Sequence, residues 1–254
     1  MNRIDQLIQN KKDILSIYFT AGYPKLNDTL EILQNLELAG VDLVEIGIPF
    51  SDPLADGPTI QASNQQALKN GMTLSLLFEQ LSELRKTVRI PVILMGYLNS
   101  ILQFGEQHFV KQCSKIGVDG LILPDLTMDY YAEYLQPAFE ANNLKHIMLV
   151  TPSSSDERIR SIDQYSSGFI YAVSTHSITG TKLQEMNAAY FRRLKDLKLK
   201  NKHLIGFGIH DQQSFERACK NGNGGIIGSA FIKHLKAHGP SQQRIHQFVK
   251  TIQP

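Results

Sequence analysis

Tryptophan is absent from this chain of 254 residues, and cysteine is scarce, with only Cys113 and Cys219. The protein therefore has no tryptophan fluorescence of its own. Two thiols cannot form a disulfide framework for so long a chain, and neither lies in a CxxC motif or at a metal-binding spacing from a histidine. We expect both to be small buried apolar side chains in a reducing cytoplasm.

Charge of one sign and long apolar runs are also lacking. The chain has 26 Lys and Arg against 24 Asp and Glu, a formal charge of +2, whereas nucleic-acid binders concentrate positive charge to displace phosphate counterions. The long run Ile90–Gly105, which has no charged residue, contains Gly and Asn and is shorter than the about 20 apolar residues of a membrane helix. Asp5 stands where a signal peptide would be apolar. We expect a cytoplasmic protein without nucleic-acid or membrane roles.

Short apolar segments alternate with longer amphipathic ones along the whole chain. Strands are expected at Ile14–Phe19, Asp42–Ile48, Val92–Leu94, Gly120–Leu123, His146–Val150, Phe169–Val173, Leu204–Phe207 and Gly225–Ile227. Such continuous Val, Ile and Leu runs are typical of a parallel sheet covered by helices, and a closed barrel of this kind takes about 250 residues.

An open doubly wound sheet is the alternative, but it often carries a glycine-rich GxGxxG turn after its first strand, which this chain lacks. The prediction is an α/β fold: a single (β/α)8 TIM barrel over residues 1–254, with an extra N-terminal helix. Its active site would lie on the loops that follow the strands.

Glu45 interrupts the aliphatic strand expected at Asp42–Ile48. Alternation places Glu45 on the face of Leu43 and Gly47, while the other face is aliphatic and suits covering helices. Glu45 should therefore point into the barrel, where burial raises the pKa of a carboxyl, as a general acid or base near pH 7 requires. The position alone allows equally a structural Glu held by hydrogen bonds.

The segment after this strand, Pro49–Pro58, holds three prolines and a glycine, which specify a rigid path. It carries Asp52 and Asp56 just beyond Glu45. Both acids also fit ordinary turns. Two carboxyl groups in differently polar settings can nevertheless divide acid and base roles.

Glycines gather where the last two strands end, in Gly206–Ile209 and Gly224–Ala230. They let backbone N–H groups approach an anion, which a helix N-terminus also attracts, and Ser229 would add a hydroxyl. These are the loops that commonly bind phosphate in such barrels. Segment 174–182 suits a mobile lid, and Tyr171 could line the pocket.

Other chemistries lack their residues. No Lys lies within a proposed strand or at its catalytic end, which disfavours a Schiff-base aldolase. The eight histidines are dispersed without HxH or HExxH spacing, so no metal site is expected.

The segment Glu45–Gln61, EIGIPFSDPLADGPTIQ, closely resembles the signature of the tryptophan synthase α subunit family. The resemblance covers essentially the whole chain, with further motifs in family order at 123–126, 178–180, 206–209 and 228–230. It implies an enzyme of tryptophan biosynthesis, a carbon–carbon lyase that cleaves indole-3-glycerol phosphate to indole and glyceraldehyde 3-phosphate by retro-aldol chemistry.

The resemblance also implies roles for residues. Glu45 would move protons at the indole C3 and the glycerol hydroxyl, and Asp56 would bind the indole N–H. The matching phosphate and pocket positions are Tyr18, Tyr171, Thr179, Gly180, Gly208, Gly228 and Ser229.

Partners follow from the same resemblance. Family members pair with a β subunit that carries pyridoxal phosphate and receives the indole, so an α2β2 tetramer is expected and this chain would bind no cofactor itself. The loops around strand two and Asp125 would form the contact surface. The chain departs from the usual pattern at Thr127, Ser177, Ile178 and Lys182, which bear on that surface and on closure of the lid.

Two other functions compete with the lyase. A different phosphate-sugar barrel, such as an isomerase, would share the phosphate loops but not the Glu45–Gln61 segment. A barrel that only activates a partner would not need both Glu45 and Asp56.

Overall fold

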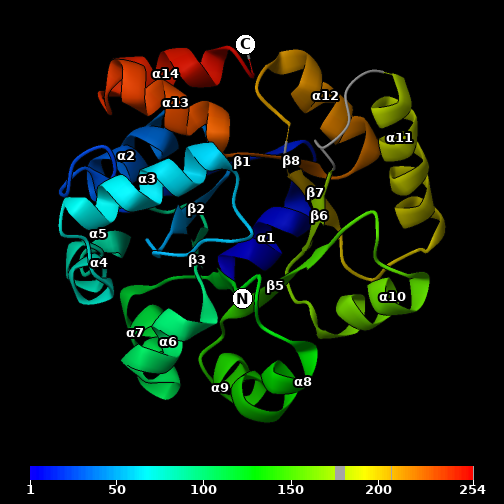
Figure 1. The fold of residues 1–254 in the computed structure, drawn as a ribbon, viewed down its shortest axis with the longest axis horizontal. Helices are drawn as coiled ribbons and strands as arrows, with labels where there is room; N and C mark the ends of the chain where they lie inside the picture. The colour runs from blue at the N-terminus through cyan, green and yellow to red at the C-terminus, as the bar shows by residue number, and fades with distance from the viewer. Residues whose placement is uncertain (175–180, 207, 254) are drawn as a thin grey trace.

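The computed structural model describes residues 1–174, 181–206 and 208–253, except for the side chains of 181–187. Eight parallel strands close into a barrel in chain order (Figure 1), and β1 pairs with β8. The strands are β1 (Ile14–Thr20), β2 (Leu43–Gly47), β3 (Val92–Met95), β4 (Gly120–Ile122), β5 (Lys145–Val150), β6 (Ile170–Val173), β7 (His203–Gly206) and β8 (Gly224–Ile227). The predicted TIM barrel is confirmed.

Helices surround the barrel and cover one of its ends. They are α1 (Arg3–Asn10), α2 (Thr29–Leu38), α3 (Pro58–Lys69), α4 (Leu74–Gln80), α5 (Leu84–Thr87), α6 (Leu98–Phe104), α7 (Glu106–Ile116), α8 (Met128–Tyr130), the π-helix η1 (Tyr131–Leu135), α9 (Gln136–Ala141), α10 (Asp156–Tyr165), α11 (Thr181–Asp196), α12 (Gln212–Asn221), α13 (Ser229–His238) and α14 (Gln242–Lys250). Within the described ranges, no helix is both long and apolar enough to cross a lipid bilayer.

Apolar side chains fill two separate cores. The larger core lies between the outer face of the strands and the helices and includes Cys113, which is buried as predicted, whereas Cys219 is only half-buried. The smaller core includes inward-facing strand residues such as Leu43 and Ile93. It also includes Ile4 and Ile8 of α1, the expected N-terminal helix, which Figure 1 shows across the middle of the ring.

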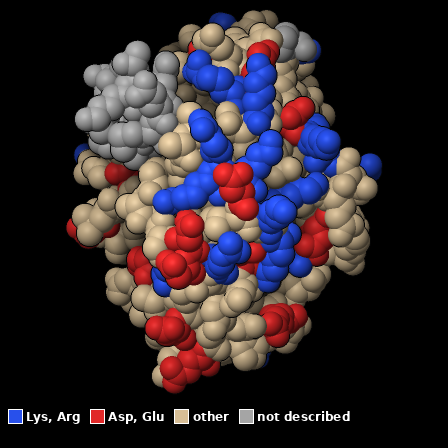
Figure 2. Space-filling model, turned by 90° about the vertical axis from the view of Figure 1, so that its right-hand side faces the viewer, with Lys and Arg blue, Asp and Glu red and all other residues tan. Residues whose placement is uncertain are grey.

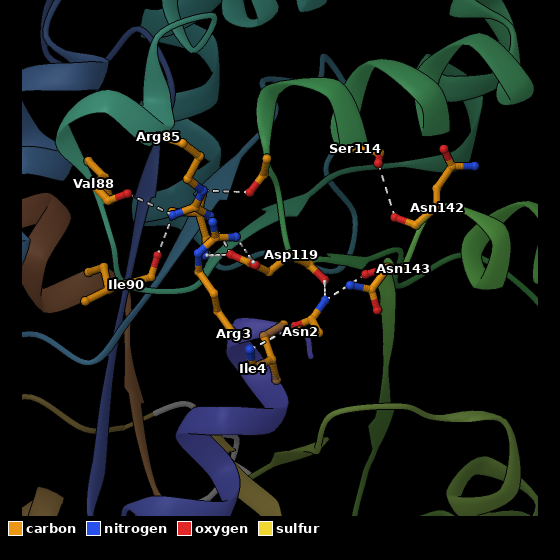
Figure 3. A network of polar contacts seen from close by, with 12 residues as sticks. Asn2, Arg3, Ile4, Arg85, Val88, Ile90, Ser114, Asp119, Asn142 and Asn143 are labelled. Atoms are coloured by element: carbon orange, nitrogen blue, oxygen red, sulfur yellow. Dashed lines mark hydrogen bonds and ion pairs between the residues drawn. The ribbon is translucent and has the colours of Figure 1, made fainter.

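A polar network fastens α1 to the amino ends of the strands (Figure 3). Asn2 caps α1 by accepting a hydrogen bond from the Ile4 N–H, and its amide donates to the Asp119 carbonyl at 2.9 Å. The Asp119 carboxylate is buried and pairs with both Arg3 and Arg85. It also accepts the Val92 N–H at 2.9 Å. The carboxylate thus joins α1 to β3 and α5 at the closed end of the barrel.

Charges on the side of the molecule are mixed in sign. Figure 2 shows the side on which α10, α11 and α12 lie, where Lys and Arg side chains gather with Asp and Glu among them. A hollow of about 450 Å³ on α10 and α11 follows this pattern, because it is lined by Arg192 and Arg193 together with Asp156 and Asp196. Its internal charge balance gives it no clear preference for an anion or a cation.

We predict that Asp119→Ala lowers the free energy of unfolding by about 3–5 kcal/mol, because it leaves the largely buried Arg85 without its counter-charge and the Val92 N–H without its acceptor. Urea denaturation measures the change. Asp5→Ala is the matched control, since the Asp5–Lys145 pair at 2.7 Å is partly exposed and should contribute no more than about 1 kcal/mol. Equal losses in the two variants would contradict a special role for Asp119.

Candidate active site

A cavity of about 420 Å³ opens at the carboxyl ends of the strands, where such barrels carry their active sites. Two carboxyl groups, Glu45 and Asp56, and two tyrosines, Tyr18 and Tyr171, line one part of it. Apolar side chains of the strands, among them Met95, Leu149 and Ile226, line another. The side hollow on α10 and α11 is as large, but only this cavity combines converging titratable groups with an apolar wall.

Glu45 lies on β2 and points into the barrel, as alternation predicted. Glu45 is 1% exposed, and the Ser16 hydroxyl donates a hydrogen bond of 2.9 Å to its Oε1. Burial raises the pKa of this carboxyl to about 8, although the Ser16 hydrogen bond acts in the opposite direction. At neutral pH the group is thus mostly protonated and can act as an acid.

Asp56 lies near the end of the loop between β2 and α3. The Tyr97 hydroxyl donates to its Oδ2 at 3.1 Å and accepts the Ala55 N–H at 3.1 Å. Burial raises the pKa of Asp56 to about 6, against the Tyr97 hydrogen bond, which lowers it. Asp52, the other acid on this loop, is exposed and accepts a hydrogen bond from Ser51, so it takes no part in the cavity.

Two glycines make room for the two tyrosines. A Cβ atom at Gly47 would lie 2.0 Å from the Tyr18 hydroxyl oxygen, and one at Gly206 would lie 2.1 Å from that of Tyr171. Any side chain at either position would displace the ring from the cavity. The glycines of β2 and β7 therefore shape the polar part of the cavity without contacting a ligand themselves.

The far end of the cavity is built from the loops after β7 and β8. Gly208, Gly228 and Ser229, which the sequence predicts to bind phosphate, all line this end. Gly228 is the N-cap of α13, and no side chain caps this end of the helix. The first N–H groups of α13 therefore remain available to an anion. Thr179, Gly180 and most of the predicted lid lie outside the described residues.

Sequence reasoning missed three polar residues of the site. Tyr97 follows β3 directly, and its place at a strand's carboxyl end was a usable signal. His210 and Lys233 line the cavity together with Gly208, Gly228 and Ser229. Lys233 lies one helical turn after Ser229, a spacing that puts both on one face of α13. One lysine does lie in a strand, although the sequence predicts none there. Lys145 begins β5, but at the amino end of the barrel, where it pairs with Asp5.

The site places groups capable of proton transfer next to an apolar wall and the uncapped N-terminus of α13. Within the described residues, no cluster of three or more His, Cys, Asp or Glu could hold a metal ion. Burial raises the pKa of Glu45 further than that of Asp56. Near pH 7 Glu45 therefore suits a proton donor, and Asp56 suits a negative charge.

Comparisons with known proteins agree with this arrangement. The family model described as tryptophan synthase alpha chain matches residues 4–253. The chain is 55% identical over 254 residues to the tryptophan synthase alpha chains of Flavobacterium psychrophilum and Flavobacterium johnsoniae, covering 99% of this chain and 100% of each relative.

Solved structures give the same result. Tryptophan synthase subunit alpha from Legionella pneumophila matches with a TM-score of 0.90 and 32% identity over 99% of this chain and 97% of that one. A chain of tryptophan synthase from M. tuberculosis matches with a TM-score of 0.85 and 27% identity over 98% and 96%. With a family model that spans nearly the whole chain and relatives of the same length, the protein belongs to the tryptophan synthase alpha chain family.

Proposed function

We propose that this protein is the lyase of tryptophan biosynthesis that cleaves indole-3-glycerol phosphate to indole and glyceraldehyde 3-phosphate. The observation that carries the proposal is the pair of carboxyl groups, Glu45 and Asp56, facing one cavity whose other end is an uncapped helix N-terminus. We infer that residues 1–254 act as one domain, because the barrel closes between its first and last strands.

The two ends of the cavity suit the two ends of this substrate. The phosphate would bind at Gly208, Gly228 and Ser229, with Thr179 and Gly180 as further contacts by family resemblance. The indole ring would lie against the apolar wall between Tyr18 and Tyr171. A substrate anchored in this way is oriented before the chemistry begins.

The reaction then needs two proton movements at one carboxyl group. The protonated Glu45 donates to C3 of the indole, and the Asp56 carboxylate stabilises the positive charge that develops on the ring nitrogen by accepting its N–H. The Glu45 carboxylate next takes the proton of the hydroxyl on the adjoining glycerol carbon. The bond between that carbon and C3 breaks, its electron pair returns to the ring, and indole and the aldehyde separate.

We also propose a β subunit as partner in an α2β2 tetramer, with pyridoxal phosphate bound on that subunit and no cofactor on this chain. Large apolar side chains are exposed on the segments after β2, β3 and β4: Leu54 is 89% exposed, Leu102 45% and Tyr134 50%. The exposed Asp125 joins two of these segments, since its carboxylate accepts the Leu98 N–H at 2.9 Å. Exposed apolar side chains on three neighbouring segments support a docking surface beside the cavity, in a cytoplasmic complex.

The test supplies indole-3-glycerol phosphate to the isolated chain, alone and with a tryptophan synthase β subunit, and measures released indole and aldehyde. We predict equal amounts of the two products, formed faster with the β subunit. Glu45→Gln should lower kcat by about 10²–10⁴-fold, because it removes the group that transfers the proton.

Asp52→Asn is the matched control, since it makes the same chemical change on an exposed acid of the adjoining loop and should leave kcat unchanged. Glu45→Gln should still bind glycerol 3-phosphate, which shows that the fold is intact. Release of indole by this variant at a rate near that of the wild type would contradict the role of Glu45.

The pH dependence of kcat/KM should be bell-shaped. Asp56 must be ionised, so the rate rises as the pH passes its pKa of about 6. Glu45 must be protonated, so the rate falls as the pH passes its pKa of about 8. Stopped assays across this range give the profile, and Asp56→Asn should remove the lower limb alone. A rate that stays constant through the higher pKa would contradict Glu45 as the donor.

Lys233→Gln should weaken the binding of glycerol 3-phosphate by about fivefold, because an exposed ammonium contributes no more than about 1 kcal/mol to an ion pair. The loss should shrink at high salt, where the charges are screened. Calorimetric titration measures the affinity. Lys236→Gln, on the same helix but away from the cavity, should bind like the wild type, and an equal loss in both variants would exclude a specific contact.

A further inference from the structure

The carboxyl group of Glu45 is fastened to the neighbouring strand through Ser16. The Ser16 hydroxyl donates to Oε1 at 2.9 Å, and both residues are buried, at 0% and 1% exposure. Among the described residues, the Glu45 side chain makes one hydrogen bond, and Ser16 is its donor. Oε2 remains for the cavity, which Glu45 lines.

Ser16 lies one layer deeper in the barrel than Glu45. The register pairs Tyr18 with Glu45, whereas Ser16 pairs with Leu43 on one side and Ile226 on the other. Leu43 and Ile226 both belong to the inner apolar core. A hydroxyl in such a layer costs free energy unless it is hydrogen-bonded, and an apolar side chain would serve packing better. The hydrogen bond to the Glu45 carboxyl therefore explains why a serine occupies this position.

We propose that Ser16 is a positioning residue that holds Oε1 of Glu45 so that Oε2 presents the transferable proton to the cavity, an inference that rests on the proposed function. Because the Ser16 O–H donates to Oε1, the proton of the neutral acid is carried by Oε2. The same hydrogen bond favours the ionised form and so lowers the pKa of Glu45, which burial raises. Ser16 thereby keeps the acid within reach of neutral pH, where it must both give and regain a proton.

The first test compares Ser16→Ala with Ser16→Thr, which keeps a hydroxyl. Ser16→Ala should lower kcat about 10- to 100-fold, as expected for loss of a hydrogen bond to a group that becomes charged, and leave KM within about twofold. The upper limb of its pH profile should move to higher pH. Ser16→Thr should restore both kcat and the profile to near those of the wild type.

Ser166→Ala is the matched control. Ser166 is also a buried serine, 3% exposed, but its hydroxyl donates to the Phe169 carbonyl at 2.8 Å, away from the cavity. This variant should lose stability without a change in the pH profile. A Ser16→Ala profile that superimposes on that of the wild type would overturn the proposal.

An infrared titration tests the contact without turnover. The carboxyl C=O stretch of Glu45 is assigned by comparison with Glu45→Gln, and its midpoint should lie at higher pH in Ser16→Ala than in the wild type; equal midpoints overturn the proposal. If Ser16→Ala does not fold, the frequency of the Glu45 C=O band in the wild type and in Ser16→Thr tests the contact instead. A hydrogen-bonded frequency supports the contact and a free one overturns it. If the wild type releases no indole, the proposed function fails, while this titration still tests Ser16.

Discussion

A carboxyl group buried inside a barrel of parallel strands is the constraint on which the rest of this structure depends. The period of two along β2 leaves Glu45 no outward alternative, because the other face of the strand packs against helices. Desolvation then raises its pKa to about 8. Among the described residues, the Ser16 hydroxyl donates to one oxygen of this group, and no hydrogen bond to the other is seen. The cost of burial and the acidity that the chemistry requires thus have the same physical origin.

The barrel separates stability from chemistry along its axis. At the amino ends of the strands, α1 and the Asp119 network with Arg3 and Arg85 close the interior with apolar packing and a fully paired carboxylate. At the carboxyl ends, the interior stays partly open and the carboxyl groups have few partners. Two buried acids in one fold therefore behave in opposite ways. The Asp119 carboxylate is paired with two cations and a backbone N–H, whereas the Glu45 carboxyl, among the described residues, accepts one hydrogen bond, from the Ser16 hydroxyl.

Much of this could be predicted from residue order. Hydrophobic runs located all eight strands to within one or two residues, because a doubly covered parallel sheet leaves a strong local signal. Alternation placed Glu45 inward, and the glycine clusters after the last two strands include Gly208 and Gly228, which line the cavity.

Other parts of the site depend on contacts between distant segments. The turn pattern of the loop does not distinguish Asp52 from Asp56. In the structure Asp56 lines the cavity and accepts a hydrogen bond from Tyr97, which follows another strand, whereas Asp52 is exposed. The importance of Ser16 similarly requires the register of β1 against β2. Lys233 had a usable local spacing from Ser229, but nothing in sequence shows that this face of α13 borders a cavity. Pairings across strands and helices are properties of the closed barrel, and no single segment encodes them.

The same cross-strand contacts explain how two acids on one segment acquire different acidities. Glu45 is held by the barrel wall, so its surroundings are set by strand register and change little. Asp56 is held by a loop, and the Tyr97 hydroxyl binds both its carboxylate and the preceding Ala55 N–H. Leu54, which precedes Ala55, is 89% exposed. The acid that depends on the loop thus lies two residues from an exposed apolar side chain, whereas the acid that depends on the strand lies inside the barrel.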